Sequence, residues 1–303
     1  MIDILLATYN GGKYISQQLD SLFGQTYQDF RIIVRDDGSS DDTLKIVDQY
    51  CKAHPGRIEV VMDGIACGSA KSNFFQLMRH STSDYAMFCD QDDVWIDNKI
   101  EITLQKMKEA ERMQNEIPIL VFSDLHVVDD NLGIINSSFM KYENLDPRKT
   151  SLNRLLAQNV ATGCTMMINR ELLKTALKFE HADRIIMHDW WCALVASQFG
   201  KVVYIDKPLV LYRQHHDNAV GAKSGKSIDY IFNMIGNLKE VKKIIENTEI
   251  QAEEFSRVFN LQGSVSDIYS RFTDFGRVKK KIYRIRYGIL KNGFVRNVGL
   301  MIL

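Results

Sequence analysis

The fold is decided by residues 2–43, which read IDILLATYNGGKYISQQLDSLFGQTYQDFRIIVRDDGSSDDT. Residues 2–9 and 30–36 are short apolar runs that end in polar residues, which is typical of buried strands. Residues 13–23 lie between them and have the spacing of an amphipathic helix. A strand, a helix and a second strand in this order indicate a βαβ unit and therefore a mainly parallel sheet. We predict an α/β protein whose functional residues gather where the strands end.

The same alternation continues along the chain. Further strands are expected at residues 58–62, 85–89, 119–128, 163–169 and 202–212, and further helices at residues 41–53, 71–80, 97–115 and 188–199. Pro208 interrupts the last of these strands, which predicts an edge strand or two shorter pieces. From residue 227 onward the pattern is helical with increasing charge. We therefore expect one domain at residues 1–224 and a C-terminal helical region with a basic amphipathic tail at residues 225–303.

Polar side chains follow three of the predicted strands. They are Thr8 and Asn10 after the first strand, Asp36 and Asp37 at the end of the second, and Asp90, Asp92 and Asp93 within FCDQDDVW at residues 88–95. Carboxylates as close as those of the third group raise one another's pKa unless a cation compensates them. Hard divalent cations such as Mg²⁺ or Mn²⁺ prefer clustered oxygen ligands, so this group is predicted to hold one. The alternative is a solvated loop with an aspartate that caps the next helix.

Taken together, residues 5–43 and the segment FCDQDDVW resemble the family-2 glycosyltransferases of the GT-A fold, and the likeness covers about residues 1–220. The order Thr-Tyr-Asn, Gln-Thr, Asp-Asp-Gly-Ser and then Asp-x-Asp is far more specific than any one piece. The form Cys-Asp-Gln-Asp-Asp, with Tyr-Arg-Gln-His at residues 212–215, is most similar to bacterial rhamnosyltransferases that build cell-surface polysaccharide. The resemblance implies a GT-A nucleotide-sugar-binding fold with a mainly parallel central sheet and a C-terminal helical appendage.

The resemblance also implies roles in binding a nucleotide-sugar donor. The positions that hold the base and ribose are matched by Thr8, Asn10 and Asp37, with Asp36 beside them. The loop that closes on the nucleotide contains Gly68 and Asn73. The pair that contacts the ribose and the metal on the diphosphate is matched by Asp90 and Asp92. Asp93 extends this metal cluster. Arg213 and His215 suit diphosphate or metal binding, and the family pattern favours His215 over His216.

Asp189 matches the catalytic base of the family and lies in MHDWW at residues 187–191. The family usually has a Glu-Asp pair here, and in this chain His188 replaces the Glu. Without the resemblance, the favoured interpretation of Asp189 is a helix N-cap followed by core tryptophans. Gly163 and Trp190 are expected to shape the acceptor site, because sugars commonly stack on aromatic rings.

These roles imply transfer of a sugar by single displacement, with inversion at the anomeric carbon and Asp189 as general base. The resemblance favours dTDP-rhamnose as donor and a saccharide or lipid-linked saccharide as acceptor. The alternative donor is a UDP-hexose or UDP-N-acetylhexosamine. Two other classes remain open: a haloacid-dehalogenase-like phosphatase, which carries Asp-x-Asp-x-Val on its first strand, and a non-catalytic assembly subunit.

Composition and charge limit the partners. The chain has 303 residues, 45% hydrophobic, and a formal net charge of zero, which excludes disorder as its main state. Its five cysteines are scattered without metal-site spacing and are expected to be reduced thiols. Eight of the 38 lysines and arginines lie in residues 277–303, which contain no acidic residue. The rest of the chain is therefore acidic, and no nucleic-acid partner is expected.

The basic tail predicts a location. We find no secretory signal and no run long enough to span a membrane, so a cytoplasmic protein is expected. Apolar residues recur along one helical face of the tail at Ile282, Ile285, Ile289, Leu290, Phe294 and Val298. This pattern is typical of an interfacial amphipathic helix and predicts peripheral contact with the inner face of the cell membrane. The alternatives are a helix packed on the catalytic domain and a basic contact within a homodimer.

Overall fold

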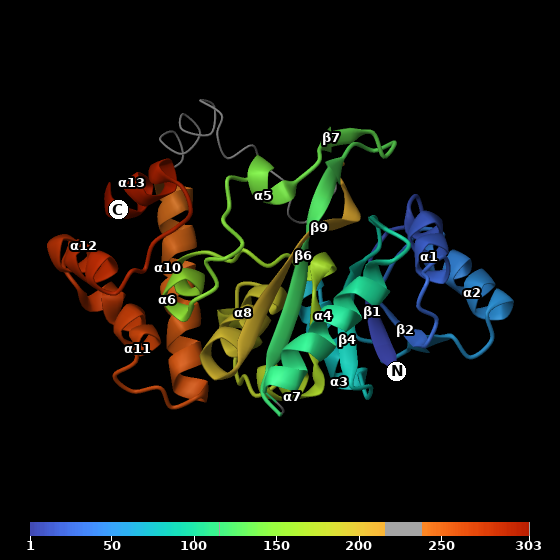
Figure 1. Cartoon of the computed structure of the whole chain (residues 1–303), viewed down its shortest axis with the longest axis horizontal. Helices are drawn as coiled ribbons and strands as arrows, with labels where there is room; N and C mark the ends of the chain where they lie inside the picture. The colour runs from blue at the N-terminus through green and yellow to red at the C-terminus, as the bar shows by residue number, and fades with distance from the viewer. Residues whose placement is uncertain (115, 216–237, 303) are drawn as a thin grey trace.

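The computed structural model describes residues 1–114, 116–215 and 238–302, so the predicted domain boundary near residue 224 lies outside the described residues. These residues form a sheet of nine strands at the centre of the molecule (Figure 1). The strands are β1 (Ile2–Thr8), β2 (Phe30–Asp36), β3 (Ile58–Val61), β4 (Tyr85–Asp90), β5 (Val94–Trp95), β6 (Ile119–Val128), β7 (Ile134–Asn136), β8 (Met167–Asn169) and β9 (Lys201–Arg213). Their order is β3-β2-β1-β4-β8-β6-β9-β5, and β7 pairs with β6.

The first four strands are parallel, as the alternating pattern predicts. In this register Thr8 lies beside Asp36, and Ala7 lies beside Asp90. The polar ends of β1, β2 and β4 therefore meet at one edge of the sheet. Strand β8 pairs antiparallel with both β4 and β6, and it joins this half to the β6–β9 pair, which is again parallel.

Two of the predicted strands differ from expectation. Strand β9 is one continuous strand of 13 residues between β6 and β5, so the prediction of an edge strand or two pieces is wrong. Its pairing with β6 shifts register where Pro208 faces Asp124, and this irregularity accommodates a residue that lacks a backbone N–H. The predicted strand at residues 163–169 begins as a 3₁₀ turn, Gly163–Thr165, and only Met167–Asn169 is extended.

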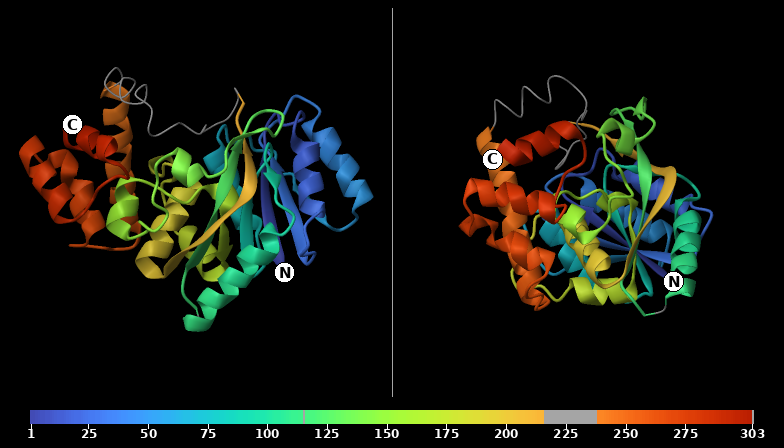
Figure 2. Two further views of the ribbon diagram at one scale, coloured as in Figure 1. Left: turned by 45° about the horizontal axis from the view of Figure 1, so that its top comes forward. Right: turned by 60° about the vertical axis from the view of Figure 1, so that its left-hand side comes forward.

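Helices cover both faces of the sheet (Figure 2). One face is covered by α1 (Ile15–Phe23), α2 (Thr43–Ala53) and α4 (Lys99–Met113), and the other by α3 (Ala70–His80), α7 (Arg170–Ala176) and α8 (His188–Phe199). Each layer buries its apolar stripe in its own hydrophobic cluster. The short helices α5 (Phe139–Tyr142) and α6 (Leu152–Ala157) lie in the connection from β7 to β8.

The described C-terminal helices pack beside α6 and α8 (Figure 1). They are α10 (Leu238–Val258), α11 (Val265–Ser270), α12 (Arg277–Arg286) and α13 (Phe294–Ile302). Phe255 of α10 lies edge-on to Trp191 of α8, with ring centroids 5.4 Å apart. The hydrophobic cluster behind α8 therefore continues into the C-terminal helices without a break.

The basic tail is not one continuous helix, which corrects the sequence prediction. It breaks between α12 and α13, where Gly288 and Gly293 have φ angles of 63° and 79°. These left-handed conformations favour glycine and end the helical turn. The break turns Ile289 into the hydrophobic cluster, whereas Ile282 and Ile285 stay exposed. The alternative of a helix packed on the domain therefore holds for the part of the tail around Ile289, and the membrane contact of the exposed part stays a prediction.

Candidate active site

The ends of β1 and β2 are tied together by the side chains that the sequence singled out. The Thr8 hydroxyl donates to Asp36 Oδ1 at 2.7 Å, and the other oxygen of Asp36 accepts from the backbone N–H of Ser39 at 2.7 Å. Asn10 has a φ of 48°, and its Oδ1 accepts from the N–H of Ser40 at 2.9 Å. These hydrogen bonds join the end of β1 to the turn after β2. The Asn10 side chain stays exposed there, and Thr8 is buried.

Asp37 faces the loop before α3. Its carboxylate accepts from the N–H of Cys67 and lies 3.6 Å from the Arg35 guanidinium. Gly68, the next residue of that loop, has a φ of 70° and no neighbouring atom where a Cβ would stand. This loop therefore borders the strand ends, as expected of a segment beside a nucleotide.

Asn73 lies inside helix α3, in agreement with the predicted helix at residues 71–80, and not in the loop where the resemblance places it. Its side chain is buried, its Oδ1 accepts from Arg35 Nη1 at 2.9 Å, and its Nδ2 donates to the Arg35 carbonyl at 3.0 Å. The Asn73 amide thus fixes Arg35, and its predicted contact with the nucleotide stays a prediction.

The acidic cluster after β4 divides into two parts. Asp92 Oδ2 lies 2.8 Å from His215 Nε2, so strand β9 brings an imidazole to the carboxylate. Asp90, Asp93 and the Cys164 thiol form a second group, in which one ligand atom of each lies within 4.8 Å of the others. Asp93 is fully buried and accepts from the backbone N–H of Arg213 at 3.2 Å.

The electrostatics of this cluster reflect crowding in a buried space. Burial, together with the carboxylates of Asp92 and Asp189, raises the pKa of Asp90 to about 7. Burial and the neighbouring carboxylates also raise the pKa of Asp93 well above its usual range. Burial lowers the pKa of Lys99 to about 7; its Nζ donates to the Cys164 carbonyl at 2.8 Å. Such a site gains from a bound cation, because the cation stabilises all the carboxylates in their ionised form.

Asp189 lies in the first turn of α8, where the sequence predicts a catalytic base. Its Oδ2 accepts from the N–H of Gly163 at 3.1 Å, and its Oδ1 accepts from the N–H of Trp190 at 2.5 Å. Burial raises the pKa of Asp189 to about 6, which suits a proton acceptor near neutral pH. Asp189 does not cap the helix by a side-chain bond from the N-cap position, which Met187 occupies.

His188, Gly163 and Trp190 pack around Asp189. The buried ring of His188 is stacked on Phe74 with centroids 4.0 Å apart, and burial lowers the pKa of His188 to about 3. His188 is therefore neutral, in contrast to the acidic residue usual at this position. Gly163 packs so closely that a Cβ there would lie 3.1 Å from His188 Nε2. The Trp190 indole N–H donates to the Leu155 carbonyl at 2.6 Å, and its role toward an acceptor stays a prediction.

Arg213 is buried and its guanidinium contacts protein acceptors. Nε donates to the Asp92 carbonyl at 2.8 Å, Nη2 donates to Gln17 Oε1 at 2.6 Å, and Nη1 donates to the Asp130 carbonyl. These contacts support a structural role, so the predicted contact of Arg213 with the diphosphate stays a prediction. The sequence reasoning missed Gln17, Asp130, Lys99 and the Cys164 side chain, because nothing in the local pattern links them to the strand ends.

Solved structures with a similar fold are glycosyltransferases. Staphylococcus aureus TarS 1–349 in complex with UDP-GlcNAc matches with a TM-score of 0.55 and 17% identity, over 99% of this chain and 90% of TarS. The mannosyltransferase PcManGT from Pyrobaculum calidifontis, in complex with GDP-Man and Mn²⁺, matches with a TM-score of 0.51 and 15% identity, over 95% and 83% of the two chains. The fold is thus the GT-A fold of nucleotide-sugar-dependent glycosyltransferases.

Sequence comparison places the chain within this class. The model of the family described as Glycosyl transferase family 2 matches residues 3–177, and the chain belongs to that family. It is 33% identical to the dTDP-rhamnosyl transferase RfbG of Shigella flexneri, over 72% of this chain and 74% of RfbG. It is 29% identical to the UDP-Glc:alpha-D-GlcNAc-diphosphoundecaprenol beta-1,3-glucosyltransferase WfgD of Escherichia coli, over 60% of this chain and 66% of WfgD. The protein is a glycosyltransferase, so the phosphatase and non-catalytic alternatives are wrong.

Proposed function

We propose that this glycosyltransferase moves rhamnose from dTDP-rhamnose to a saccharide or lipid-linked saccharide acceptor, with inversion, in the synthesis of cell-surface polysaccharide. The observation that carries the proposal is the pairing of a half-buried base with an acidic donor site. Asp189 of α8 lies close enough to Asp90 of β4 for its carboxylate to raise the pKa of Asp90. The likeness to RfbG supports rhamnose, and the name of WfgD supports a lipid diphosphate acceptor.

Asp189 performs the proton transfer. The acceptor hydroxyl oxygen bonds to the anomeric carbon while the bond from that carbon to the diphosphate oxygen breaks. The hydroxyl proton passes to the Asp189 carboxylate, so no covalent enzyme intermediate is formed. The N–H groups of Gly163 and Trp190 hold the carboxylate in place during this step. Preorganisation of this kind avoids the cost of orienting the base in the transition state.

The residues of the acidic cluster fit a divalent cation. Asp92 and His215 offer an oxygen and a nitrogen 2.8 Å apart, and Asp90 and Asp93 supply further carboxylates nearby. Hard carboxylate ligands with one imidazole suit Mn²⁺ or Mg²⁺. A bound cation would supply positive charge to the diphosphate as it leaves.

The metal role is tested by calorimetry of donor binding with and without EDTA. We expect the wild-type protein to lose donor affinity in EDTA, and Asp92→Ala to bind donor weakly in both conditions. Asp206→Ala removes an exposed carboxylate of β9 and should behave as the wild type. Equal wild-type affinity with and without EDTA would exclude a metal role.

The nucleotide is tested by competition. A UDP-hexose or UDP-N-acetylhexosamine is the second candidate donor, because WfgD is described as using UDP-Glc. We expect dTDP to displace a labelled donor at lower concentration than UDP. A clear preference for UDP would overturn the choice of dTDP-rhamnose and leave the fold and the base unaffected.

We further propose that α12 places the protein on the inner face of the cell membrane. Val278, Ile282 and Ile285 are 72%, 56% and 67% exposed and recur at the spacing of one helical face. Lys279 and Arg286 are exposed beside this stripe. An apolar stripe flanked by cations is the pattern of a helix that lies in the headgroup region of an anionic bilayer. No helix among the described residues is long and apolar enough to cross a membrane.

Vesicle flotation tests the membrane contact. Deleting the tail would remove Ile289 from the core, so we choose Ile282→Ser with Ile285→Ser, which alter only exposed side chains. The control is Ile134→Ser with Ile135→Ser, an exposed pair on β7. We expect the wild type and the control to float with phosphatidylglycerol vesicles at low salt, and the α12 variant to stay in the soluble fraction. Failure of the wild type to float would exclude the proposal.

A further inference from the structure

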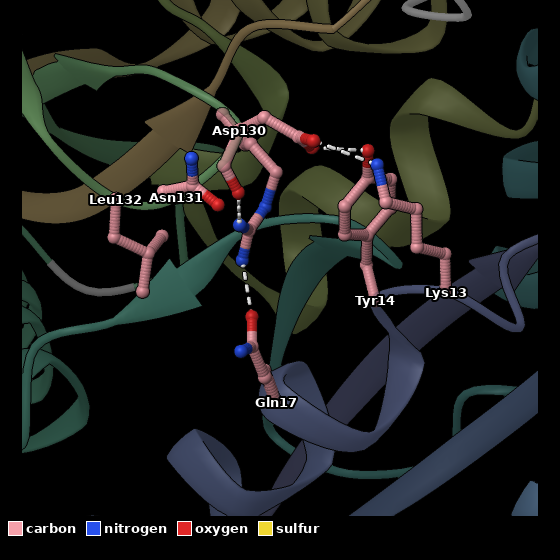
Figure 3. A pocket seen from close by; sticks show the side chains of 7 residues that line it. Lys13, Tyr14, Gln17, Asp130, Asn131 and Leu132 are labelled. Atoms are coloured by element: carbon pink, nitrogen blue, oxygen red, sulfur yellow. Dashed lines mark hydrogen bonds and ion pairs between the residues drawn. The ribbon is translucent and has the colours of Figure 1, made fainter.

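Beside the Asp92–His215 pair lies a compact group of side chains that no role so far explains (Figure 3). We call it the Tyr14 cluster, and it consists of Lys13, Tyr14 and Gln17 at the start of α1, Asp130 in the turn after β6, and Arg213 at the end of β9. The Tyr14 hydroxyl donates to Asp130 Oδ1, and Lys13 Nζ lies 2.7 Å from Asp130 Oδ2. The cluster therefore joins three segments that are distant in the sequence.

Tyr14 contacts the imidazole directly. Its ring is stacked on the His215 ring, with centroids 4.8 Å apart and an interplanar angle of 29°. Tyr14 is 9% exposed, and its hydroxyl is fixed by Asp130, so the ring has little freedom to move. A histidine at the end of a strand would otherwise sample several rotamers, and stacking against a fixed ring restricts them.

Arg213 fixes the other side of the pair. Its Nε holds the backbone carbonyl of Asp92, and its guanidinium carbon lies 4.7 Å from the centroid of the Tyr14 ring. Gln17 accepts from its Nη2, which ties the guanidinium to helix α1. The buried Arg213 guanidinium thus contacts both the backbone of Asp92 and the Tyr14 ring that stacks on His215.

We infer that Tyr14 and Arg213 are positioning residues that hold His215 and Asp92 together as a preformed pair of ligands for a divalent cation. This inference rests on the proposed metal role of the pair. Groups that orient metal ligands typically change metal affinity by about 10–100-fold when they are removed. Tyr14 and Arg213 act through His215 and Asp92, so their loss should weaken metal binding before any effect on the acceptor.

The test measures binding of Mn²⁺ alone, from the electron paramagnetic resonance signal of the free ion. We expect Tyr14→Leu to raise the Mn²⁺ dissociation constant about 10–100-fold. Tyr14→Phe keeps the stacked ring and should stay within about threefold of the wild type. Tyr27→Leu removes a half-buried tyrosine elsewhere in the chain as a control, and should bind Mn²⁺ as the wild type does. Gln17→Ala, which frees one arm of Arg213, should raise the constant at least about threefold.

The outcomes separate the inference from the metal role itself. If Asp92→Ala binds Mn²⁺ as tightly as the wild type, or the wild type binds none, the metal role fails and the inference fails with it. If Asp92→Ala loses binding while Tyr14→Leu and Gln17→Ala bind normally, only the positioning inference is overturned. Should Tyr14→Leu fail to fold, as judged by circular dichroism, unchanged binding by Gln17→Ala overturns it.

Discussion

Replacing Asp189 by Asn should strongly slow sugar transfer and leave donor binding intact. The change keeps the shape of the side chain and removes the proton acceptor, which lowers kcat by about 10²–10⁴-fold for a general base. The wild-type enzyme should show the same group in its pH profile. Because the pKa of Asp189 is raised to about 6, roughly nine tenths of it is ionised at pH 7 and about one tenth at pH 5. The wild-type kcat should therefore fall about tenfold as the pH drops from 7 to 5.

The assay is release of nucleoside diphosphate in the presence of acceptor, with donor and Mn²⁺ saturating so that kcat is measured. Asp189→Asn should keep a low residual rate that does not fall between pH 7 and pH 5. Its donor affinity, measured by calorimetry, should match that of the wild type. Asp183→Asn replaces an exposed aspartate upstream of α8 and controls for the loss of a carboxylate. It should keep both the wild-type rate and the fall of kcat between pH 7 and pH 5. If Asp189→Asn transfers sugar at the wild-type rate, or its kcat falls with pH as that of the wild type does, the assignment of the base is refuted.

Two further predictions concern packing. Gly163→Ala should lower kcat about tenfold without changing donor affinity, since its Cβ would stand 3.1 Å from His188 Nε2 and displace the residue next to Asp189. An unchanged kcat would show that the base tolerates this shift. Asp3→Ala should destabilise the fold by about 3 kcal/mol, because it removes the buried carboxylate that accepts from Ser81, Ser83 and the Arg31 guanidinium, although Arg31 keeps Glu59 at 2.9 Å. Urea unfolding measures this loss, and a change below about 1 kcal/mol would show that the Asp3–Arg31 pair contributes little.

Several features of the site could be predicted from local sequence because local chemistry dictates them. Buried parallel strands need continuous apolar residues, so the runs ending at Thr8, Asp36 and Asp90 marked β1, β2 and β4. Strands of a parallel sheet end at a common edge, which is why these polar ends could be placed together before any coordinates. The GT-A fold and the sugar-transfer class were implied by the resemblance of these residues, in this order, to the family-2 glycosyltransferases, and the comparisons confirm both.

What the sequence left open depends on contacts between distant segments. Pro208 predicts a broken or edge strand from its own chemistry, yet β9 stays continuous because the register shift opposite Asp124 absorbs it. The buried Gln251 and Glu254 of α10 offer another example. They accept backbone N–H groups of residues 180, 181 and 186, the segment leading to the helix of Asp189.

The sequence by itself determined the parallel half-sheet and the acidic strand ends, since each depends on residue types at short spacing. The class of reaction came from the resemblance of these residues to the family-2 glycosyltransferases. Only the tertiary structure decided that His215 meets Asp92, that Tyr14 and Arg213 support this pair, and that the basic tail is half buried and half exposed. The physical reason is that a stacked ring, a buried guanidinium or a packed helix gains its energy from a partner far along the chain. The periodicity and spacing of residues in the sequence do not identify such a partner.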